Sequence, residues 1–350
     1  MSSREWFRPE ILAIPAYVPG KPGDREDVIK LASNEMAYPT LPAVQAVIDA
    51  GTGRLNRYPD MFATGLVADI ARYHEWPDGG VVVGNGSVAL IEKALQALVV
   101  PGGEVVLAWR SFEAYPIAIA AAGGRAVRVP LRDGAHDLVG MLRAITPHTR
   151  AVLVCSPNNP TGVALTHTEL AAFLDQVPES VPVLLDEAYI DFVTMGDAVR
   201  SVELLADHPN LVVLRTFSKA YSLAGLRCGY ALASTEMAAG LRAVSTPFGV
   251  NSLAQEAARA ALRSRDEVRR RCGSVVAERD KLVAALAAHG VRVPPTQANF
   301  VWLESFGAGF ESACAEAGVT VRRFGEEGVR ATVAEPEGSL RLLRAVAAVL

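Results

Sequence analysis

The chain has 350 residues, of which 50% are hydrophobic, 21% charged and 7% aromatic. This composition is typical of a globular, enzyme-sized protein and excludes disordered, fibrous and disulfide-stapled classes. The net charge of −4 gives no electrostatic support for binding nucleic acid or a membrane surface. The four cysteines form no CxxC pair, and neither a signal peptide nor a membrane-length apolar stretch is found. We therefore expect a cytoplasmic protein without a bound metal.

Short apolar segments alternate with alanine- and leucine-rich stretches of helical period in the first two thirds of the chain. The predicted strands are residues 80–84, 104–109, 125–130, 150–155, 181–186, 210–217 and 228–233. Their apolar residues are almost continuous, which indicates strands buried on both faces. The pattern predicts an α/β fold with one mostly parallel, seven-stranded sheet between helices.

The length exceeds what one hydrophobic core usually covers, so we expect more than one domain. Residues 1–30 are rich in proline and glycine and are predicted to form an N-terminal arm. Residues 31–240 would form a large domain, and residues 241–350 a smaller α+β C-terminal domain. Within the latter, residues 251–289 are predicted to form one long helix.

One predicted strand end carries an amine. Only five of the 34 basic residues are lysines, and Lys219 directly follows a predicted buried strand. Lys93 and Lys281 fall on charged faces of predicted helices, whereas Lys21 and Lys30 fall in or just after the arm. Ligands of open α/β sheets bind beyond the carboxyl ends of the strands. Lys219 is therefore the candidate for amine chemistry.

A glycine-rich loop, Gly84-Asn85-Gly86-Ser87-Val88, follows the strand at 80–84 and leads into a predicted helix. Free N–H groups at such a helix N-terminus can bind phosphate, but Ser87 can also be an ordinary N-cap. The loop also matches half of a dinucleotide-binding motif, which requires an acidic residue about 20 residues further on. The next strand ends instead in Trp109-Arg110-Ser111, which weakens the dinucleotide interpretation.

Polar side chains also follow the other predicted strands. They are Asn159, Asp186, Tyr189, Thr216, Ser218 and Arg227. Pyridoxal phosphate requires such a set: a lysine for a Schiff base with its aldehyde and a carboxylate for its pyridine nitrogen. Its phenolic oxygen needs hydrogen-bond donors, and its phosphate needs a helix end and an arginine. The combination predicts a pyridoxal-phosphate site.

Several segments resemble the fold-type I pyridoxal-phosphate aminotransferases, in the histidinol-phosphate aminotransferase branch. They are KLASNE (30–35), NRYPD (56–60), SPNNPTG (156–162), DEAYIDF (186–192), RTFSKAYSLAGLRCGY (215–230), QANFVW (297–302) and GVRATVA (328–334). They span nearly the whole chain in the order found in that family. The resemblance implies an aspartate-aminotransferase-like, three-layer large domain. It also implies a ping-pong exchange of an amino group between an amino acid and a keto acid such as 2-oxoglutarate.

The resemblance assigns roles to cofactor-binding residues. Lys219 would bind the aldehyde and move the substrate proton, Asp186 would pair with the pyridine nitrogen, and Tyr189 would bind the phenolic oxygen together with Asn159. Phe112 would stack on the cofactor ring where the family commonly has a tyrosine. The phosphate would be held by Ser87, Val88, Thr216, Ser218 and Arg227.

The resemblance also implies partners and substrate contacts. Tyr58 would reach the phosphate of the neighbouring subunit, in a homodimer with shared sites. Arg330 would bind the substrate α-carboxylate bidentately. Tyr17 and Arg322 match family positions near the distal end of the substrate, and Asn34 is a further expected substrate contact.

Two segments, AWRSFEAYP (108–116) and TPFGVNS (246–252), are more similar to actinobacterial aromatic amino acid aminotransferases of this branch. They would place Trp109, Phe112 and Phe248 around a substrate ring, although Trp109 can equally fill the core at the end of its strand. A pocket lined by Phe112 and Trp109 without a second arginine would favour an aromatic donor. We expect phenylalanine, tyrosine or tryptophan as substrate, with histidinol phosphate as the alternative.

Overall fold

The computed structural model describes residues 6–14, 27–304 and 306–350. Seven strands form one sheet in the order β2-β8-β7-β6-β5-β3-β4. They are β2 (Val81–Gly84), β3 (Glu104–Trp109), β4 (Arg125–Pro130), β5 (Thr149–Cys155), β6 (Val183–Asp186), β7 (Leu211–Thr216) and β8 (Gly229–Ala233). Six of these strands run in one direction, and β8, between β2 and β7, runs in the opposite direction. The predicted mostly parallel, seven-stranded sheet is confirmed.

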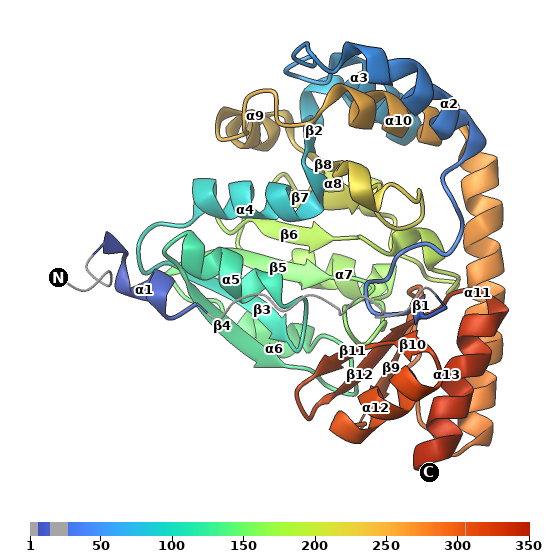
Figure 1. The fold of residues 1–350 in the computed structure, drawn as a ribbon. Coiled ribbons are helices and arrows are strands. Elements are labelled where there is room, and N and C mark those ends of the chain that lie inside the picture. Colours follow the sequence, from blue (N-terminus) through green and yellow to red (C-terminus); the bar gives the residue numbers. More distant parts are fainter. Residues whose placement is uncertain (1–5, 15–26, 305) are drawn as a thin grey trace.

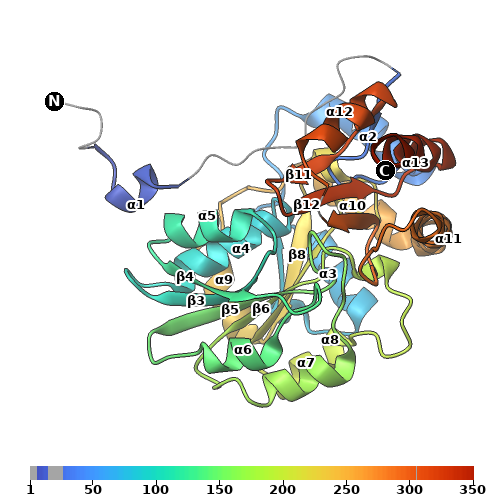
Figure 2. The same ribbon diagram turned by 90° about the horizontal axis from the view of Figure 1, so that it is seen from below.

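Helices cover both faces of this sheet, as Figures 1 and 2 show. One face carries α4 (Gly86–Leu98), α5 (Ala114–Ala121) and α9 (Thr235–Ala243), and the other carries α6 (Leu138–Arg143), α7 (His167–Leu174) and α8 (Ser201–Asp207). Each side forms an apolar cluster with the buried side chains of the sheet. The continuous apolar runs of the strands are therefore explained by burial on both faces.

The stretch predicted as one helix over residues 251–289 consists of two helices. They are α10 (Ser252–Arg263) and α11 (Arg265–Ala288), and Ser264 separates them. The backbone of Ser264 leaves helical geometry at φ −93° and ψ 26°, and its hydroxyl donates a 3.0 Å hydrogen bond to the carbonyl of Ala260. A serine hydroxyl that bonds back to the preceding turn bends helices, and this accounts for the break.

A smaller sheet follows α11. It contains β9 (Phe300–Glu304), β12 (Gly328–Thr332) and β11 (Arg322–Phe324), all antiparallel. A two-residue strand, β1 (Ile29–Lys30), pairs with β10 (Val319–Thr320). The remaining helices are α1 (Pro9–Leu12), α2 (Pro42–Gly51), α3 (Thr64–His74), α12 (Ala308–Glu316) and α13 (Pro336–Val349). In Figure 1, α13 lies beside α11. We propose a domain boundary near residue 240, between the two sheets.

The strand directions bring several chain segments to one edge of the large sheet. The parallel pairs β3–β5, β5–β6 and β6–β7 all end there. The antiparallel strand β8 begins there, with Gly229 paired to Gly84 on one side and to Thr216 on the other. The loops predicted to carry functional residues therefore start from the same edge. No helix in the described ranges is both long and apolar enough to cross a bilayer.

Candidate active site

A cavity of about 310 Å³ lies at this sheet edge. Of the predicted site residues, its lining includes Asn34, Ser87, Val88, Phe112, Asn159, Asp186, Tyr189, Thr216, Ser218, Lys219, Arg227, Arg322 and Arg330. Two predicted residues are not among them: Tyr58 lies elsewhere, and Tyr17 lies outside the described residues. Segments separated by up to 300 residues in the sequence thus contribute to one cavity.

Lys219 follows β7 and extends its amine into the cavity lining. The Nζ atom donates a 2.9 Å hydrogen bond to the carbonyl of Ser33. Removal from water lowers the pKa of Lys219 to about 7, and the positive charge of Arg330 adds to this effect. A substantial fraction of the amine is therefore neutral, and hence nucleophilic, at neutral pH.

Asp186 is the last residue of β6 and is 4% exposed. Burial raises its pKa to about 6, while a hydrogen bond from Tyr115 opposes the rise. The hydroxyl of Tyr115 donates to Oδ2 at 2.8 Å, and the N–H of Ala188 donates to Oδ1 at 3.1 Å. Tyr115 is not among the residues that the sequence predicts for the site. Its spacing of three residues from Phe112, at the start of α5, was the available signal.

Two pairs of side chains link the large sheet to the C-terminal strands and to the segment after β1. The amide of Asn34 donates a 2.9 Å hydrogen bond to the hydroxyl of Tyr189. Arg330, on β12, donates from Nη1 to Oδ1 of Asn159 at 2.6 Å and from Nη2 to the carbonyl of Ala32 at 2.7 Å. Both arrangements hold polar groups in fixed directions around the cavity.

The N-terminus of α4 forms the other end of the cavity. Asn85 is the N-cap, without a side-chain capping bond, so Ser87 lies inside the first turn and the N-cap interpretation of Ser87 was wrong. Gly86 has φ +82°, and a Cβ there would lie 2.8 Å from Nη2 of Arg227. Nη1 of Arg227 donates to the hydroxyl of Ser218 at 3.3 Å, and that hydroxyl lies 2.9 Å from Thr216 Oγ1. Two hydroxyls, a guanidinium and a helix N-terminus thus lie together at this end of the cavity.

The sequence matches the family described as "Aminotransferase class I and II" over residues 26–346. The chain belongs to the class I and II aminotransferases. Two relatives named aromatic amino acid aminotransferase come from Streptomyces coelicolor and Mycobacterium bovis. The first is 49% identical, covering 95% of this chain and 94% of the relative. The second is 46% identical, covering 97% and 96%.

Solved structures agree with this family. A histidinol-phosphate aminotransferase from Sinorhizobium meliloti, in complex with pyridoxal-5'-phosphate, has a TM-score of 0.90 at 26% identity and covers 100% of this chain and 99% of its own. A mutant aspartate aminotransferase from Thermus thermophilus, 24% identical, shares the fold with a TM-score of 0.82 over 98% and 99% of the chains. The expected aspartate-aminotransferase-like architecture is confirmed.

The aminotransferase uses pyridoxal phosphate, as its family does, and the cavity residues fit this cofactor. Phosphate requires hydrogen-bond donors and positive charge, which the N-terminus of α4 and Arg227 provide. A pyridine nitrogen requires a buried carboxylate, which Asp186 provides, and an aldehyde requires an amine of low pKa, which Lys219 provides. The protein is therefore a pyridoxal-phosphate-dependent aminotransferase.

The predicted ring-binding aromatic residues are only partly in the cavity. Phe112 lines it, but Trp109 and Phe248 are absent from its lining. Trp109 instead packs at the margin of the apolar cluster beneath α4 and α5, with the guanidinium of Arg128 4.4 Å from its ring centroid. The core-filling alternative for Trp109 is the better description. A second arginine, Arg322, also lines the cavity, so the expected aromatic-pocket pattern is met only for Phe112.

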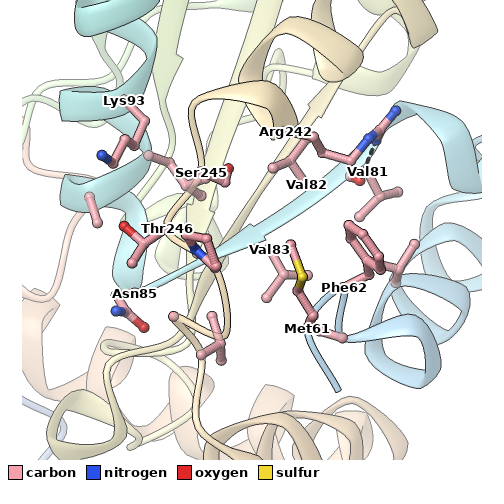
Figure 3. A pocket seen from close by; sticks show the side chains of 18 of the residues that line it. Met61, Phe62, Val81, Val82, Val83, Asn85, Lys93, Arg242, Ser245 and Thr246 are labelled. Carbon is pink, nitrogen blue, oxygen red and sulfur yellow. Dashed lines mark hydrogen bonds between the residues drawn. The ribbon is translucent and has the colours of Figure 1, made fainter. Parts of the chain in front are cut away.

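The aminotransferase has a second cavity, about 430 Å³ in volume, and none of the described residues that line it is a predicted site residue. Figure 3 shows it beside β2, with Met61 and Phe62 on one side and Ser245 and Thr246 on another. Arg242 donates a 3.2 Å hydrogen bond to the carbonyl of Val81 at its margin. The lining is largely apolar, so this hollow differs in chemistry from the cavity around Lys219.

Proposed function

We propose that this aminotransferase transfers the amino group of an aromatic amino acid to a keto acid such as 2-oxoglutarate, by a ping-pong mechanism. The substrate class is supported by the relatives named aromatic amino acid aminotransferase, 46–49% identical over at least 94% of both chains. The chemistry is supported by one observation above all: Lys219, Asp186 and Arg330 line the same cavity.

Pyridoxal phosphate, when bound, supplies an aldehyde that condenses with amines and a protonated ring that withdraws electrons. The Nζ atom of Lys219 would hold the aldehyde of the cofactor, and the same amine, once free, would take the proton from the substrate Cα. Asp186 would hold the proton on the pyridine nitrogen, because its carboxylate, with a pKa of about 6, is mostly ionised at neutral pH.

The remaining cavity residues bind and orient. We assign the phenolic oxygen to Tyr189 and Asn159, the ring face to Phe112, and the substrate carboxylate to Arg330. A planar guanidinium binds a carboxylate through two parallel hydrogen bonds, which fixes the plane of the substrate. Asn34 orients Tyr189 through their 2.9 Å hydrogen bond. The phosphate is assigned to Ser87, the N–H of Val88, Thr216, Ser218 and Arg227.

We further propose a homodimer in which Tyr58 serves the partner's site. Tyr58 is 83% exposed, and its ring centroid lies 4.8 Å from that of Phe248, which is also exposed. Met61 and Phe62 are exposed beside the apolar second cavity. Such a surface is typical of a protein interface. The four cysteines are buried and free, which supports our proposal of a reducing, cytoplasmic location.

The substrate proposal is tested by comparing kcat/KM for phenylalanine, tyrosine, tryptophan and histidinol phosphate, each with 2-oxoglutarate. We expect at least one aromatic donor to exceed histidinol phosphate. The opposite order would replace the aromatic assignment by histidinol phosphate, the substrate in the names of several structural relatives of 22–26% identity.

The role of Lys219 is tested separately. Lys219→Ala should abolish turnover, and borohydride should no longer fix the cofactor covalently to the protein. Lys281→Ala, on the exposed face of α11, is the matched control and should behave as wild type. Substantial turnover by the Lys219 variant would contradict the assignment.

A further inference from the structure

Arg322 is a charged residue of the cavity that the assigned cofactor and carboxylate contacts leave unused. It stands directly opposite Arg330 in the β11–β12 pair. Opposite residues of an antiparallel pair project their side chains on the same face, about 5 Å apart at Cβ. A substrate whose carboxylate binds Arg330 therefore has Arg322 as a neighbour, and a free guanidinium there would attract an anionic distal group.

Arg322 is paired with the carboxylate of Glu113. Nη2 of Arg322 donates a 2.7 Å hydrogen bond to Oε2 of Glu113, and both side chains are largely buried, 11% and 26% exposed. The other carboxylate oxygen of Glu113 lies 3.8 Å from Nη1 of Arg110. Arg110 in turn forms a two-pronged ion pair with Glu327. Alternating charges thus connect the loop after β3 with the β11–β12 hairpin.

An aromatic ring holds these guanidiniums in place. The centroid of Phe324 lies 5.3 Å from Cζ of Arg322, 5.7 Å from that of Arg110 and 5.6 Å from that of Arg330. Stacking on an aromatic face restricts the orientation of a guanidinium. Arg322, which lines the cavity, is therefore held both by the carboxylate of Glu113 and by the ring of Phe324.

We propose that Glu113 is a specificity-determining residue that neutralises Arg322 and so excludes substrates with a distal phosphate. The inference rests on the proposed function. A phosphate monoester at Arg322 would have to displace Glu113 and would then leave two anions beside one another, which is a repulsive element against that substrate class. An uncharged aromatic ring meets no such penalty and packs against the planar guanidinium.

The test is Glu113→Gln, which keeps the shape of the side chain and removes its charge. The kcat/KM for histidinol phosphate, relative to that for phenylalanine, should rise roughly tenfold to hundredfold, the range expected for one charge-assisted hydrogen bond. The KM for 2-oxoglutarate, whose distal group is a carboxylate, should fall in the same variant. As a binding readout, inhibition by histidinol phosphate should strengthen, whereas inhibition by unphosphorylated histidinol should stay constant.

Two further variants separate charge balance from general disruption. Glu327→Gln removes a nearby acid that pairs with Arg110 rather than with Arg322, and its substrate ratio should equal that of wild type. The double variant Glu113→Gln/Arg322→Gln should lose the gain in phosphate recognition. An unchanged ratio in Glu113→Gln, with wild type active on phenylalanine, would overturn this inference alone. A wild-type preference for histidinol phosphate would overturn the proposed substrate and this inference together.

Discussion

The hydroxyl of Tyr115 donates a 2.8 Å hydrogen bond to Oδ2 of Asp186, and both side chains are buried. Burial raises the pKa of Asp186 to about 6, and the bond from Tyr115 counteracts this rise. An ionised carboxylate is needed opposite the pyridine nitrogen, and the pKa of Asp186 lies only a little below neutral pH. A further rise of this pKa would therefore protonate the carboxylate at neutral pH. Tyr115 is therefore a positioning residue that keeps Asp186 charged.

Tyr115→Phe should consequently raise the pKa of Asp186 further. A hydrogen bond to a charged group contributes about 1.5–3 kcal/mol, which corresponds to a shift of roughly one to two pH units. The acid limb of the kcat/KM profile should move to higher pH, with a loss of about two- to tenfold near pH 7 that shrinks toward pH 8.5. Tyr38→Phe, outside the cavity lining, is the control. A uniform loss at all pH values would argue against this role.

The residues around the cavity could be predicted because they follow strands that the sequence already defines. Lys219, Asp186 and Asn159 each come shortly after a near-continuous apolar run, and parallel strands end at the same sheet edge. Spacing therefore implied proximity without any knowledge of side-chain positions. The break at Ser264 lay below what periodicity resolves, because a single residue decides it.

Other features required side-chain directions. Trp109 lies at the end of β3, a position equivalent to that of the residues that line the cavity after other strands. Its side chain nevertheless packs against the apolar cluster and does not line the cavity. The contacts of Tyr115 and Glu113 depend on where the start of α5 places each side chain, and one of the partners, Arg322, comes more than 200 residues later. Composition and spacing carry no information on such pairings.

Gly86→Ala should weaken cofactor binding. Gly86 has φ +82°, which costs an L-residue about 1–2 kcal/mol, and the new Cβ would lie 2.8 Å from Nη2 of Arg227. We expect the Kd for pyridoxal phosphate to rise at least tenfold, measured by fluorescence titration of the apoprotein. Gly240→Ala, in α9, should leave the Kd unchanged, because no atom of the described part of the chain lies within 4 Å of the added methyl. Equal Kd values for both variants would show that the phosphate site at the N-terminus of α4 does not require glycine at position 86.

The pKa of Lys219 also predicts a pH-dependent stability of the apoprotein. The ordinary lysine pKa is 10.5, and that of folded Lys219 is about 7. Between these values the unfolded chain binds more protons, so stability rises with pH in this window. Lys219→Met removes the group, and its advantage in free energy of unfolding over wild type should be largest below pH 7.

This advantage should then shrink as pH rises, by at most about 1.4 kcal/mol per pH unit. Urea unfolding of both apoproteins at pH 6.5, 7.5 and 8.5 measures the difference. Lys281→Met, at an exposed position on α11, should differ from wild type by a constant amount. A pH-independent difference for Lys219→Met would show that its amine titrates normally.

Arg330→Lys should impair substrate binding because it removes the planar fork. Lysine cannot donate simultaneously to Asn159 Oδ1 and the Ala32 carbonyl in the geometry that Arg330 adopts, at 2.6 and 2.7 Å. We expect KM for phenylalanine to rise roughly 30- to 150-fold, from the loss of about 2–3 kcal/mol of charge-assisted hydrogen bonding. Arg323→Lys, paired with Glu311 outside the cavity, should leave KM unaltered.

Mixed dimers would decide whether Tyr58 acts across the interface. One chain carries Lys219→Ala and the other Tyr58→Ala, each with a different affinity tag, and the heterodimer is purified through both tags. If Tyr58 serves the partner's site, the site with an intact Lys219 receives an intact Tyr58 from the other chain. The heterodimer should then show about half the wild-type turnover per dimer and wild-type cofactor affinity at that site.

The exposed position of Tyr58, outside the lining of its own cavity, is the reason to expect this result. If Tyr58 instead acted within its own chain, both sites of the heterodimer would be defective, because one lacks Lys219 and the other lacks Tyr58. Turnover would then resemble that of the Tyr58→Ala homodimer. A monomer by light scattering under assay conditions would exclude the shared site altogether, since no partner would be present to supply the phenol.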